Sequence, residues 1–589
     1  MDGNQPTKTP VFDRHIDEIL KTLKPHQSKC KQCDEVFAIF KEDIDFYKIF
    51  QVPPPKFCPA CRSRRRAAFY PRLYDFFRKP CSAPGHSEQV ISIYPPESPI
   101  KIYDLDFWFS DFWDPIEFQK DLTPENFLKQ FQELAFETPH PAGIRGTRLT
   151  DCNYTIGGLD SKDCYYTTTA ASSENICYSF MLLHSKHCLD CSDSEELELC
   201  YEIVDSKRCY NCSFLQDCTN CIDSDFLFDC HNCSSCFACC NLRNRQYYFF
   251  NQPCTKDDYF KRRKDVFLGN CQALKRTKKE FEEKVLKIAL RRNLYTKNTI
   301  NSLGHKIENC QDCYFVFSGY GQENQHLRYC EEFQGAKDLM DTCGTSYDSY
   351  IYDTAAAIRC SGVRFSFWIT NSSDIEYSMF CDNCHHCFGC FGLKNKEHCI
   401  LNKQYSREDY WRLVDEIKTN LAKQNQYGEF FEPRVFKFYP YNNTMAFLSF
   451  PKTKEEAEKE GYLWAERERW SRETKGSDPN VLFAPDGLPD DIREVKDDIM
   501  NKAIVCEISK RPFKLVKREL DFYRQKGLPL PSKHPYQRLI DRSQKQASRY
   551  SLYAFVCPKC QKQTHTIYPP EAQKEYNICC EACYLKEVV

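Results

Sequence analysis

Short apolar or aromatic runs alternate with polar corners through the middle of the chain. Triplets such as Asp-Ser-Lys and His-Ser-Lys mark several of these corners, and cysteines return at intervals of 9 to 13 residues. Units this short, rich in Ser, Asp and Asn, are poorly suited to helices and are typical of stacked β-strand repeats. We therefore predict a β-solenoid here, marked by cysteines at positions 152, 164, 177, 188, 200, 209, 218, 230 and 239.

The repeat block occurs twice. The segment "CFACCNLRNRQYYFFNQPCTKDDYF" from Cys236 aligns with "CFGCFGLKNKEHCILNKQYSREDYW" from Cys387 at an offset of 151 positions. In each copy a hydroxyl residue, Thr255 or Ser406, is followed three positions later by an aspartate, a pattern typical of a helix start. We predict two solenoid blocks, 150–254 and 305–405, each closed by a helix.

Each end of the chain carries two C-x2-C pairs. The inner cysteines are separated by 24 residues at the N-terminal end and by 19 at the C-terminal end, enough for a β-hairpin. Two such turns present four thiolates, the set that holds zinc in a closed tetrahedral site. We predict one structural zinc ion per end, bound by Cys30, Cys33, Cys58 and Cys61 and by Cys557, Cys560, Cys580 and Cys583.

Each end also contains a second ribbon that has lost cysteines. A shift of 476 positions places the first site on Cys506, Ser509, His534 and Gln537, and the last site falls on Cys81, Pro84, Asp104 and Phe107. Two good ligands hold zinc too weakly, although His86 lies near Cys81. We expect packing to have replaced the metal at both degenerate sites.

These patterns predict a mainly β fold with helical connectors, in which two cysteine-rich β-solenoid-like blocks are flanked by double zinc-ribbon modules. The modules occupy 28–115 and 501–589. We predict the remaining segments as a polar tail at 1–27 with a short helix around 16–23, a helical linker at 116–149, a helical connector at 255–304 and a helical or mixed linker at 406–500.

Both blocks contain a C-x2-C-x2-C-x2-C run. The spacing is similar to a ferredoxin run, but its last step is one residue shorter and no proline follows. Three interpretations stay open: thiols packed as small hydrophobes in ladders, which we favour, extra zinc sites, or an iron–sulfur cluster, the least favoured. The residues concerned are Cys230, Cys233, Cys236 and Cys239 and Cys381, Cys384, Cys387 and Cys390.

Composition places the protein in a reducing compartment. Its 38 cysteines among 589 residues would be typical of a secreted disulfide scaffold. The N-terminal sequence is polar, however, and no apolar stretch reaches membrane-spanning length. We expect a cytoplasmic protein without a membrane span, of three or four domains; its oligomeric state is left open.

Charge is segregated although the net charge is only −2. Between residues 56 and 80 there are eight Lys or Arg and one Asp, whereas residues 151–240 contain fifteen acids and four bases. Basic residues interleaved with aromatics are typical of nucleic-acid surfaces; the alternative is a solvated face or a contact with the acidic block. The candidate phosphate contacts are Arg62, Arg64, Arg65, Arg66 and Arg72.

No nucleotide-binding, hydrolase or metalloprotease motif is present, and we predict no catalytic residues. The predicted function is a zinc-binding scaffold that binds nucleic acid or a protein partner through its basic ribbon ends. The alternative is a metal-cluster or redox protein that uses the C-x2-C runs of the blocks. An enzyme with its site on a solenoid face stays open as a third interpretation, on fold-level analogy alone.

The segment "VPPPKFCPACRSRR" resembles the probable zinc-ribbon domains of bacteria. The order of double ribbon, "IYPPESPIKIYDLDFWFSDFWDP", cysteine repeats, "CEISKRPF" and closing ribbon is similar to that of large uncharacterised proteins from candidate-phylum bacteria. The resemblance implies zinc binding by the eight cysteines of the two intact sites and no particular activity. The substitutions at Pro84, Phe107, Ser509 and Gln537 depart from the pattern.

Overall fold

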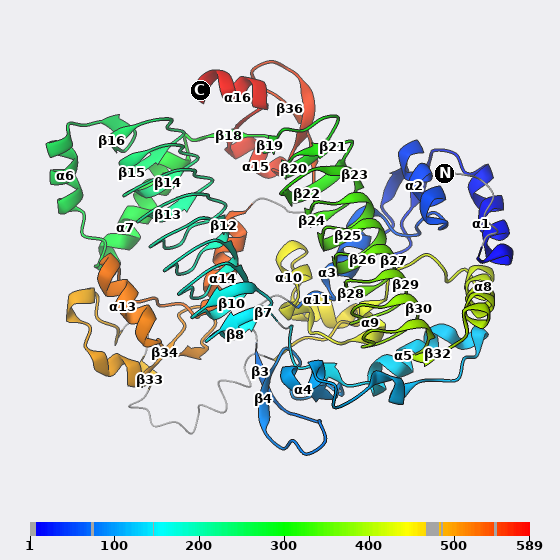
Figure 1. The fold of residues 1–589 in the computed structure, drawn as a ribbon. Helices are drawn as coiled ribbons and strands as arrows, with labels where there is room; N and C mark the ends of the chain where they lie inside the picture. The colour runs from blue at the N-terminus through cyan, green and yellow to red at the C-terminus, as the bar shows by residue number, and fades with distance from the viewer. Residues whose placement is uncertain are drawn as a thin grey trace.

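Two stacks of parallel strands form the two halves of the molecule, as Figure 1 shows for the computed structural model. The structure describes residues 8–71, 76–144, 146–466, 482–483, 487–546 and 551–588. Strands contribute the largest share of regular structure and helices nearly as much, so the mainly β prediction holds with more helix than expected. Within the described residues, no helix combines the length and apolar character needed to cross a membrane.

The first stack covers residues 147–249. Its strands pair in parallel with the residue 12 positions further on, as in Phe180↔Ser192 and Ser213↔Asp225, and single bridges such as Lys186↔Glu198 continue the ladder. A short antiparallel strand, β17 (Gln252–Pro253), closes it. The other strands are β7 (Thr147–Thr150), β8 (Asn153–Ile156), β9 (Leu159–Lys162), β10 (Tyr165–Ala171), β11 (Phe180–Leu183), β12 (Ser192–Glu195), β13 (Ser213–Gln216), β14 (Asp225–Phe228), β15 (Ser234–Cys240) and β16 (Gln246–Phe249).

The second stack covers residues 296–404 and contains longer strands. From β25 onwards its register also advances by 12 positions, as in Leu339↔Ile351 and Ser373↔His385. Its strands are β19 (Thr296–Lys297), β20 (Leu303–Glu308), β21 (Cys310–Gln311), β22 (Tyr314–Tyr320), β23 (Asn324–Arg328), β24 (Glu331–Gln334), β25 (Lys337–Ser346), β26 (Ser349–Ile358), β27 (Ser361–Arg364), β28 (Phe367–Thr370), β29 (Ser373–Glu376), β30 (His385–Phe388), β31 (Glu397–Ile400) and β32 (Lys403–Gln404).

The backbone of both stacks turns at every third residue. From Arg148 to Phe250 every third residue has a positive φ, and the same holds from His326 to Leu401. Left-handed φ is unfavourable for most side chains but tolerated by Asn and Asp, which explains the polar corners. Side-chain amides stack along one corner, where Asn220 bonds Asn232 at 2.8 Å and Asn232 bonds Asn244 at 2.9 Å.

In most units the residue after the left-handed position is buried inside the stack. Cys212, Cys218 and Cys221 are each 0% exposed, and their thiols donate to the carbonyl two residues back, as from Cys221 to Thr219 at 3.6 Å. Ser206 makes the same bond to Val204 at 2.9 Å. Cysteine and serine are therefore the small interior residues of three-residue units. Where two successive units both have cysteine at this position, the sequence reads C-x2-C.

The two ribbon modules share one order of elements, except that the C-terminal module has an additional helix, α15, before its last strand. The N-terminal module contains β1 (His26–Lys29), β2 (Val36–Ile39), α2 (Lys41–Phe50), α3 (Pro59–Ala67), β3 (Phe77–Pro80), β4 (Gln89–Ser92), β5 (Ile102–Tyr103) and α4 (Leu105–Phe109). The C-terminal module contains β34 (Ala503–Val505), β35 (Pro512–Phe513), α13 (Lys517–Lys526), α14 (Pro535–Lys545), β36 (Tyr553–Val556), β37 (Gln563–Thr566), α15 (Pro570–Glu575), β38 (Asn577–Cys579) and α16 (Glu581–Val588).

Helices connect these parts and cover the stacks. They are α1 (Pro10–Thr22), η1 (Pro115–Phe118), η2 (Pro124–Asn126), α5 (Phe127–Glu137), α6 (Lys256–Asp265), α7 (Cys271–Phe281), η3 (Glu282–Leu286), α8 (Arg407–Lys423), α9 (Pro433–Phe436), η4 (Tyr441–Asn443), α10 (Met445–Ser449), α11 (Lys454–Lys459), η8 (Ile492–Glu494) and η9 (Asp497–Asn501). Short strands β6 (His140–Pro141), β18 (Leu290–Arg292) and β33 (Leu482–Phe483) lie between them. Part of the predicted linker 406–500 lies outside the described residues.

The segment predicted as a polar tail at 1–27 contains a helix that overlaps the short helix expected around 16–23 and begins earlier. Within it, α1 buries Phe12, Ile16 and Leu20 and packs against α8, where the backbone N–H of Phe12 donates to Asp415 at 2.8 Å. An amphipathic helix with three buried apolar residues belongs to the core rather than to a tail.

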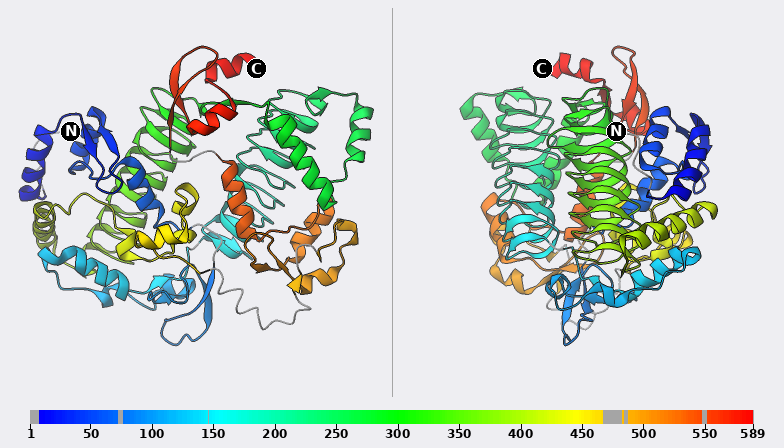
Figure 2. Two further views of the ribbon diagram at one scale, coloured as in Figure 1. Left: turned by 180° about the vertical axis from the view of Figure 1, so that it is seen from behind. Right: turned by 45° about the vertical axis from the view of Figure 1, so that its right-hand side comes forward.

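The modules dock crosswise. The N-terminal module packs on the second stack, where α3 contacts β25 and β26, and the C-terminal module packs on the first stack through α14. Figure 1 shows α2 beside the stack on the right and α13 and α14 beside the stack on the left. Figure 2 shows the two stacks side by side, with the coils of each lying one above another.

A shared buried carboxylate anchors the N-terminal module. Arg62 and Arg66 lie one turn apart in α3 and both reach Asp341, at 2.9 Å and 3.5 Å. All three side chains are buried, and Asp341 is 0% exposed. A second contact joins Asp43 of α2 to Tyr329, whose hydroxyl donates at 3.3 Å.

The C-terminal module repeats this interface. Arg538 and Arg542 lie one turn apart in α14 and both reach Asp190, the second at 2.7 Å. Glu519 of α13 accepts a hydrogen bond from Tyr178 at 3.0 Å. The module residues are displaced by 476 positions from their N-terminal counterparts and the stack residues by 151, the two offsets of the sequence duplication. One docking mode therefore occurs twice.

We expect Asp190→Asn to destabilise the protein by about 3 kcal/mol or more, because it removes the buried carboxylate that pairs with Arg542 and leaves Arg538 with Glu519 alone. Asparagine preserves the shape and tolerates the left-handed backbone (φ 56°) at this position. The free energy of unfolding in urea measures the effect. The matched control is Asp223→Asn, an exposed corner residue, for which a change within about 0.5 kcal/mol is expected; equal effects of the two substitutions would contradict the buried-anchor interpretation.

Candidate metal centres

Four cysteines of the N-terminal module converge on one point. One sulfur from each of Cys30, Cys33, Cys58 and Cys61 lies within 4.8 Å of the others, and the Cys33 and Cys58 sulfurs are 3.6 Å apart. Four thiolates bound to zinc at about 2.3 Å lie about 3.8 Å from one another. The group can therefore hold a metal ion without large rearrangement.

Local backbone geometry produces this convergence. The first pair sits on the turn after β1, where the Cys30 N–H donates to Glu35 at 2.9 Å and Asp34 adopts a left-handed φ of 62°. The second pair begins α3, with Cys58 at the N-cap. The positive end of a helix favours thiolates, and the hydrogen bond from Cys61 lowers the pKa of Cys58 to about 5.

The C-terminal four-cysteine group has the same construction. Cys557, Cys560, Cys580 and Cys583 bring their sulfurs within 4.8 Å of one another, and the Cys560 and Cys580 sulfurs are 3.5 Å apart. Burial raises the pKa of Cys557, but backbone N–H donors, first that of Cys580, outweigh it and lower the pKa to about 6. This group can also hold a metal ion.

At the degenerate site of the C-terminal module the turn survives without the ligand set. The Cys506 N–H donates to Arg511 at 2.9 Å and Lys510 keeps a left-handed φ of 57°, as at the intact turns. His534 uses Nδ1 to accept the N–H of Tyr536 at 3.1 Å and thereby caps α14. The His534 side chain is therefore used as a helix cap.

At the other degenerate site the structure gathers more donors than the sequence indicated. His86 and Asp104 both approach Cys81, where packing was expected to have replaced the metal, and Glu88 joins them within the same 4.8 Å. Glu88 was not among the predicted donors, although its place two residues after His86 in the sequence indicated it.

The stack thiols are arranged differently. Among the described residues, the C-x2-C-x2-C-x2-C runs are not among the groups of three or more donor atoms that converge within 4.8 Å. Their S–H groups point instead to backbone carbonyls, as from Cys233 to His231 at 3.4 Å and from Cys384 to Asp382 at 3.4 Å. Burial raises the pKa of Cys239 to about 12.

The arginines predicted to contact nucleic acid are mostly inside the protein. Arg62, Arg65 and Arg66 are at most 5% exposed and form ion pairs, Arg65 with Glu429 at 3.1 Å. They therefore cannot reach a phosphate. Their partners lie within the chain, but Asp341 and Asp353 belong to the second stack, so the alternative of a contact with the acidic block 151–240 is also wrong for these arginines. Arg64 is half-buried, and Arg72 lies outside the described residues.

Aromatics predicted to stack on bases are also internal. Phe69 and Tyr70 are at most 2% exposed, and Phe69 packs edge-on against Phe430 at 5.3 Å. Tyr74 lies outside the described residues. The basic segment after Lys56 is thus an internal interface in its described part.

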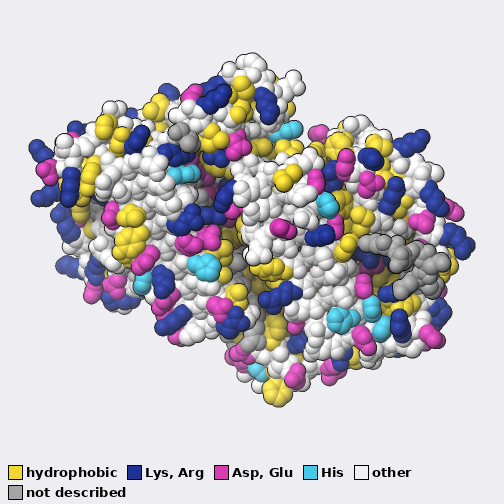
Figure 3. Space-filling model, turned by 45° about the horizontal axis from the view of Figure 1, so that its top comes forward, with side chains coloured by type: hydrophobic (Ala, Val, Ile, Leu, Met, Phe, Trp, Pro, Cys, Tyr) yellow, Lys and Arg dark blue, Asp and Glu magenta, His cyan; other side chains and the backbone are white. Residues whose placement is uncertain are grey.

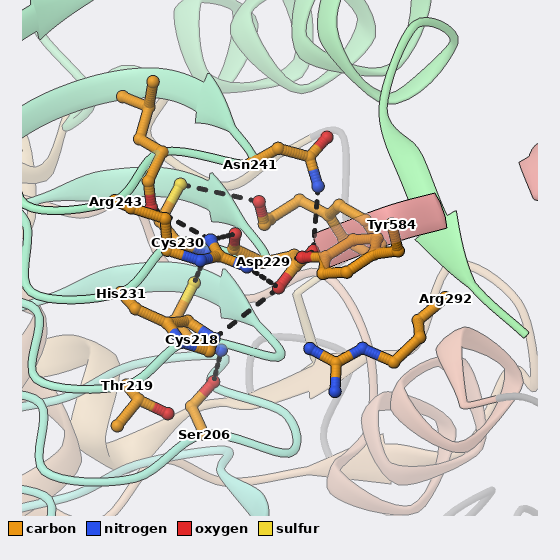
Figure 4. A network of polar contacts seen from close by, with 12 residues as sticks. Ser206, Cys218, Thr219, Asp229, Cys230, His231, Asn241, Arg243, Arg292 and Tyr584 are labelled. Carbon is orange, nitrogen blue, oxygen red and sulfur yellow. Dashed lines mark hydrogen bonds and ion pairs between the residues drawn. The ribbon is translucent and has the colours of Figure 1, made fainter. Parts of the chain in front are cut away.

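A polar network attaches the C-terminal ribbon to the first stack (Figure 4). Buried Asp229 accepts hydrogen bonds from Asn241 at 2.8 Å and from the Tyr584 hydroxyl, and it pairs with Arg243 at 3.0 Å. Burial and the charge of Asp229 raise the pKa of Tyr584, so its hydroxyl remains a donor.

We expect Tyr584→Phe to lower the free energy of unfolding by about 1–3 kcal/mol, because it removes a hydrogen-bond donor from the buried Asp229 carboxylate. Faster hydrogen exchange at β38 and α16, together with a lower unfolding midpoint, would measure the loosened attachment. Tyr576→Phe, which removes a hydroxyl from a residue that is 39% exposed, is the control; loosening of the ribbon by the control alone would contradict the network's role.

The arrangement therefore comprises two closed four-thiolate groups and one mixed donor cluster on a duplicated scaffold. No known protein family and no curated protein sequence matches this chain.

Proposed function

We propose that the protein is a zinc-dependent structural scaffold, in which two four-cysteine zinc ribbons hold the outer modules rigid and the modules hold two β-solenoids together. The observation that carries the proposal is the placement of four sulfurs within 4.8 Å at both ends, beside interfaces that join each module to a stack. Four-cysteine sites are closed and contribute directly to folding.

The β-solenoid assignment is part of the proposal. It is supported by parallel registers that advance by 12 residues and by left-handed residues at every third position. The resemblance to bacterial zinc-ribbon proteins supports the same function. A cytoplasmic location would keep the thiols reduced, as zinc binding requires.

The redox alternative receives less support. Reactive redox thiols need exposure, whereas Cys230, Cys236, Cys381 and Cys387 are at most 1% exposed. A metal cluster needs several sulfurs that face one point, and among the described residues neither run forms such a group. Burial raises the pKa of Cys230 and Cys381, whereas hydrogen bonds from neighbouring thiols, first that of Cys381, lower the pKa of Cys384 to about 4. Packed thiols that donate to carbonyls explain both runs.

Zinc content tests the scaffold. We expect two zinc ions per chain to survive dialysis against a weak chelator, measured by mass spectrometry on protein purified without oxygen. Cys33→Ser and Cys560→Ser should each lose one ion, because each removes a thiolate from one closed site. Amides of β1–β2 and of β36–β37, respectively, should then exchange faster.

Cys254→Ser, which replaces a half-buried thiol outside both sites, is the matched control and should keep two zinc ions. Iron with visible absorption, or two zinc ions retained by both site variants, would contradict the proposal. Zinc that binds but whose removal leaves the hydrogen exchange of these strands unchanged would contradict the structural role.

A second candidate function is polyanion binding on the helices beside the first stack. Between residues 256 and 288, nine exposed Lys or Arg face four exposed Asp or Glu, and Figure 3 shows Lys and Arg side chains gathered on the left, where α6 and α7 lie. Phe260 and Ile288 are 50% and 62% exposed there. Basic and aromatic side chains together suit a nucleic-acid backbone.

The combined substitution of Lys264, Lys275 and Arg276 by Ala should weaken RNA or DNA binding in a mobility-shift salt series. The slope of log affinity against log salt should fall by about 0.9 per lost phosphate contact. The matched control substitutes Lys129, Lys423 and Lys459, exposed lysines elsewhere. Absence of retardation at low salt, or equal weakening by the control, would reject this candidate.

A further inference from the structure

The mixed cluster lies at the closed end of the β3–β4 hairpin. The His86 Nδ1 atom is 2.7 Å from the Glu88 carboxylate and 3.3 Å from that of Asp104. The Cys81 sulfur is 3.6 Å from the same Asp104 oxygen, Oδ2. One thiol, one imidazole and two carboxylates thus face a common point.

This point is the metal position of a ribbon. Cys81 and Asp104 correspond to Cys557 and Cys580 at the 476-residue offset. In both ribbons the later residue donates its backbone N–H to the sulfur of the earlier one, at 3.3 Å from Asp104 and at 3.4 Å from Cys580. Hydrogen bonds of this kind support a thiolate ligand.

Strand pairing confirms the correspondence. Just before Asp104, β5 pairs in parallel with β6 through Ile102↔His140. Just before Cys580, β38 pairs in parallel with β18 through Ile578↔Arg291. The strands that deliver the third ligand are therefore fixed in the same way, and Figure 1 shows the two ribbons at opposite ends of the molecule, α4 below and α16 above.

Two lost cysteines have local replacements. At the position of Cys560 in the intact ribbon, the degenerate ribbon has Pro84 followed by Gly85. The left-handed φ of Gly85, +80°, turns the hairpin and brings His86 to the site. Where the intact ribbon has Cys583, this chain has Phe107, which packs edge-on against the His86 ring at 5.1 Å. The aromatic side chain thus positions the imidazole.

Asp104 divides its two oxygens between structure and site. Oδ1 accepts the N–H groups of Asp106 and Phe107, both at 3.0 Å, and caps α4. Oδ2 is left to face Cys81 and His86. This arrangement fixes the orientation of the carboxylate, as outer-shell bonds do for metal ligands.

We propose that Cys81, His86 and Asp104 form a third metal site, for a zinc-class divalent ion, with Glu88 as an exchangeable fourth ligand. Cys81 is 6% exposed, whereas the Glu88 side chain is 53% exposed. Three protein ligands of mixed type with a solvent-facing fourth position are typical of reactive zinc sites, unlike closed four-cysteine sites. The site is separate from the two proposed structural centres.

Cobalt titration tests the third site. Protein that keeps its two tightly held zinc ions is titrated with Co²⁺, and we expect one further ion per chain with the weak charge-transfer band of a single thiolate and tetrahedral d–d bands. Zinc added afterwards should displace it. The two four-cysteine centres serve as internal references, because their zinc content is measured in the same samples.

Substitutions assign the ligands. Cys81→Ser and His86→Ala should weaken Co²⁺ binding at least tenfold. Asp104→Asn should do the same while keeping the helix cap, because asparagine caps as well as aspartate. Glu88→Gln should weaken binding less than these three. Cys254→Ser is the matched thiol control.

Unchanged circular dichroism and retention of two zinc ions would show that each variant is folded. The proposal is overturned if no cobalt binds beyond the two occupied centres, or if the bands persist in Cys81→Ser and His86→Ala. It is also overturned if Asp104→Asn binds as the unaltered protein does. Failure of the four-cysteine prediction would appear separately, as zinc content below two in the unaltered protein.

Discussion

Two arginines that share one buried carboxylate form the interaction on which the rest of this structure depends. Burying three charges is costly unless each is paired, so the geometry is stable only when the module sits in one orientation on its stack. Asp341 and Asp190, both 0% exposed, impose that orientation on the N-terminal and C-terminal modules. Because buried ion pairs contribute more to specificity than to net stability in some proteins, we interpret these pairs as the element that fixes which stack each module chooses.

The crossed docking follows from that choice and shapes the whole chain. The polypeptide leaves the N-terminal module, builds the first stack, builds the second stack under the N-terminal module, and returns to cover the first. Contacts beyond the arginine anchors have diverged while keeping their places. Tyr584 meets Asp229 and Arg243 in one half, and the corresponding Trp108 meets Phe380 at 6.3 Å and Lys394 at 4.8 Å in the other. A polar contact and an aromatic one thus perform the same attachment.

Much of this could be predicted from the sequence, because duplication and spacing are local properties. The offsets 476 and 151, the caps at Thr255 and Ser406, and the convergence of both four-cysteine groups are all present in the structure. The sequence also indicated the positive charge of the ribbons, but it did not indicate which acidic residues pair with it. The sequence around Arg66 would be the same whether this side chain were exposed on a basic surface or buried in an ion pair. Only the fold brings Asp341, 275 positions further along the chain, to Arg66.

The cysteine spacing shows why such ambiguity is physical rather than a matter of missing data. A zinc turn needs C-x2-C because two thiolates must leave one tight turn on the same side. A coil built of three-residue units needs the same spacing because one residue in three points inward, as at Cys218 and Cys221. What separates the two cases is the surrounding backbone: strand hairpins aim four sulfurs at one point, whereas a coil aims each thiol at a carbonyl. Periodicity over many units, more than any single motif, therefore distinguishes a packed thiol from a metal ligand.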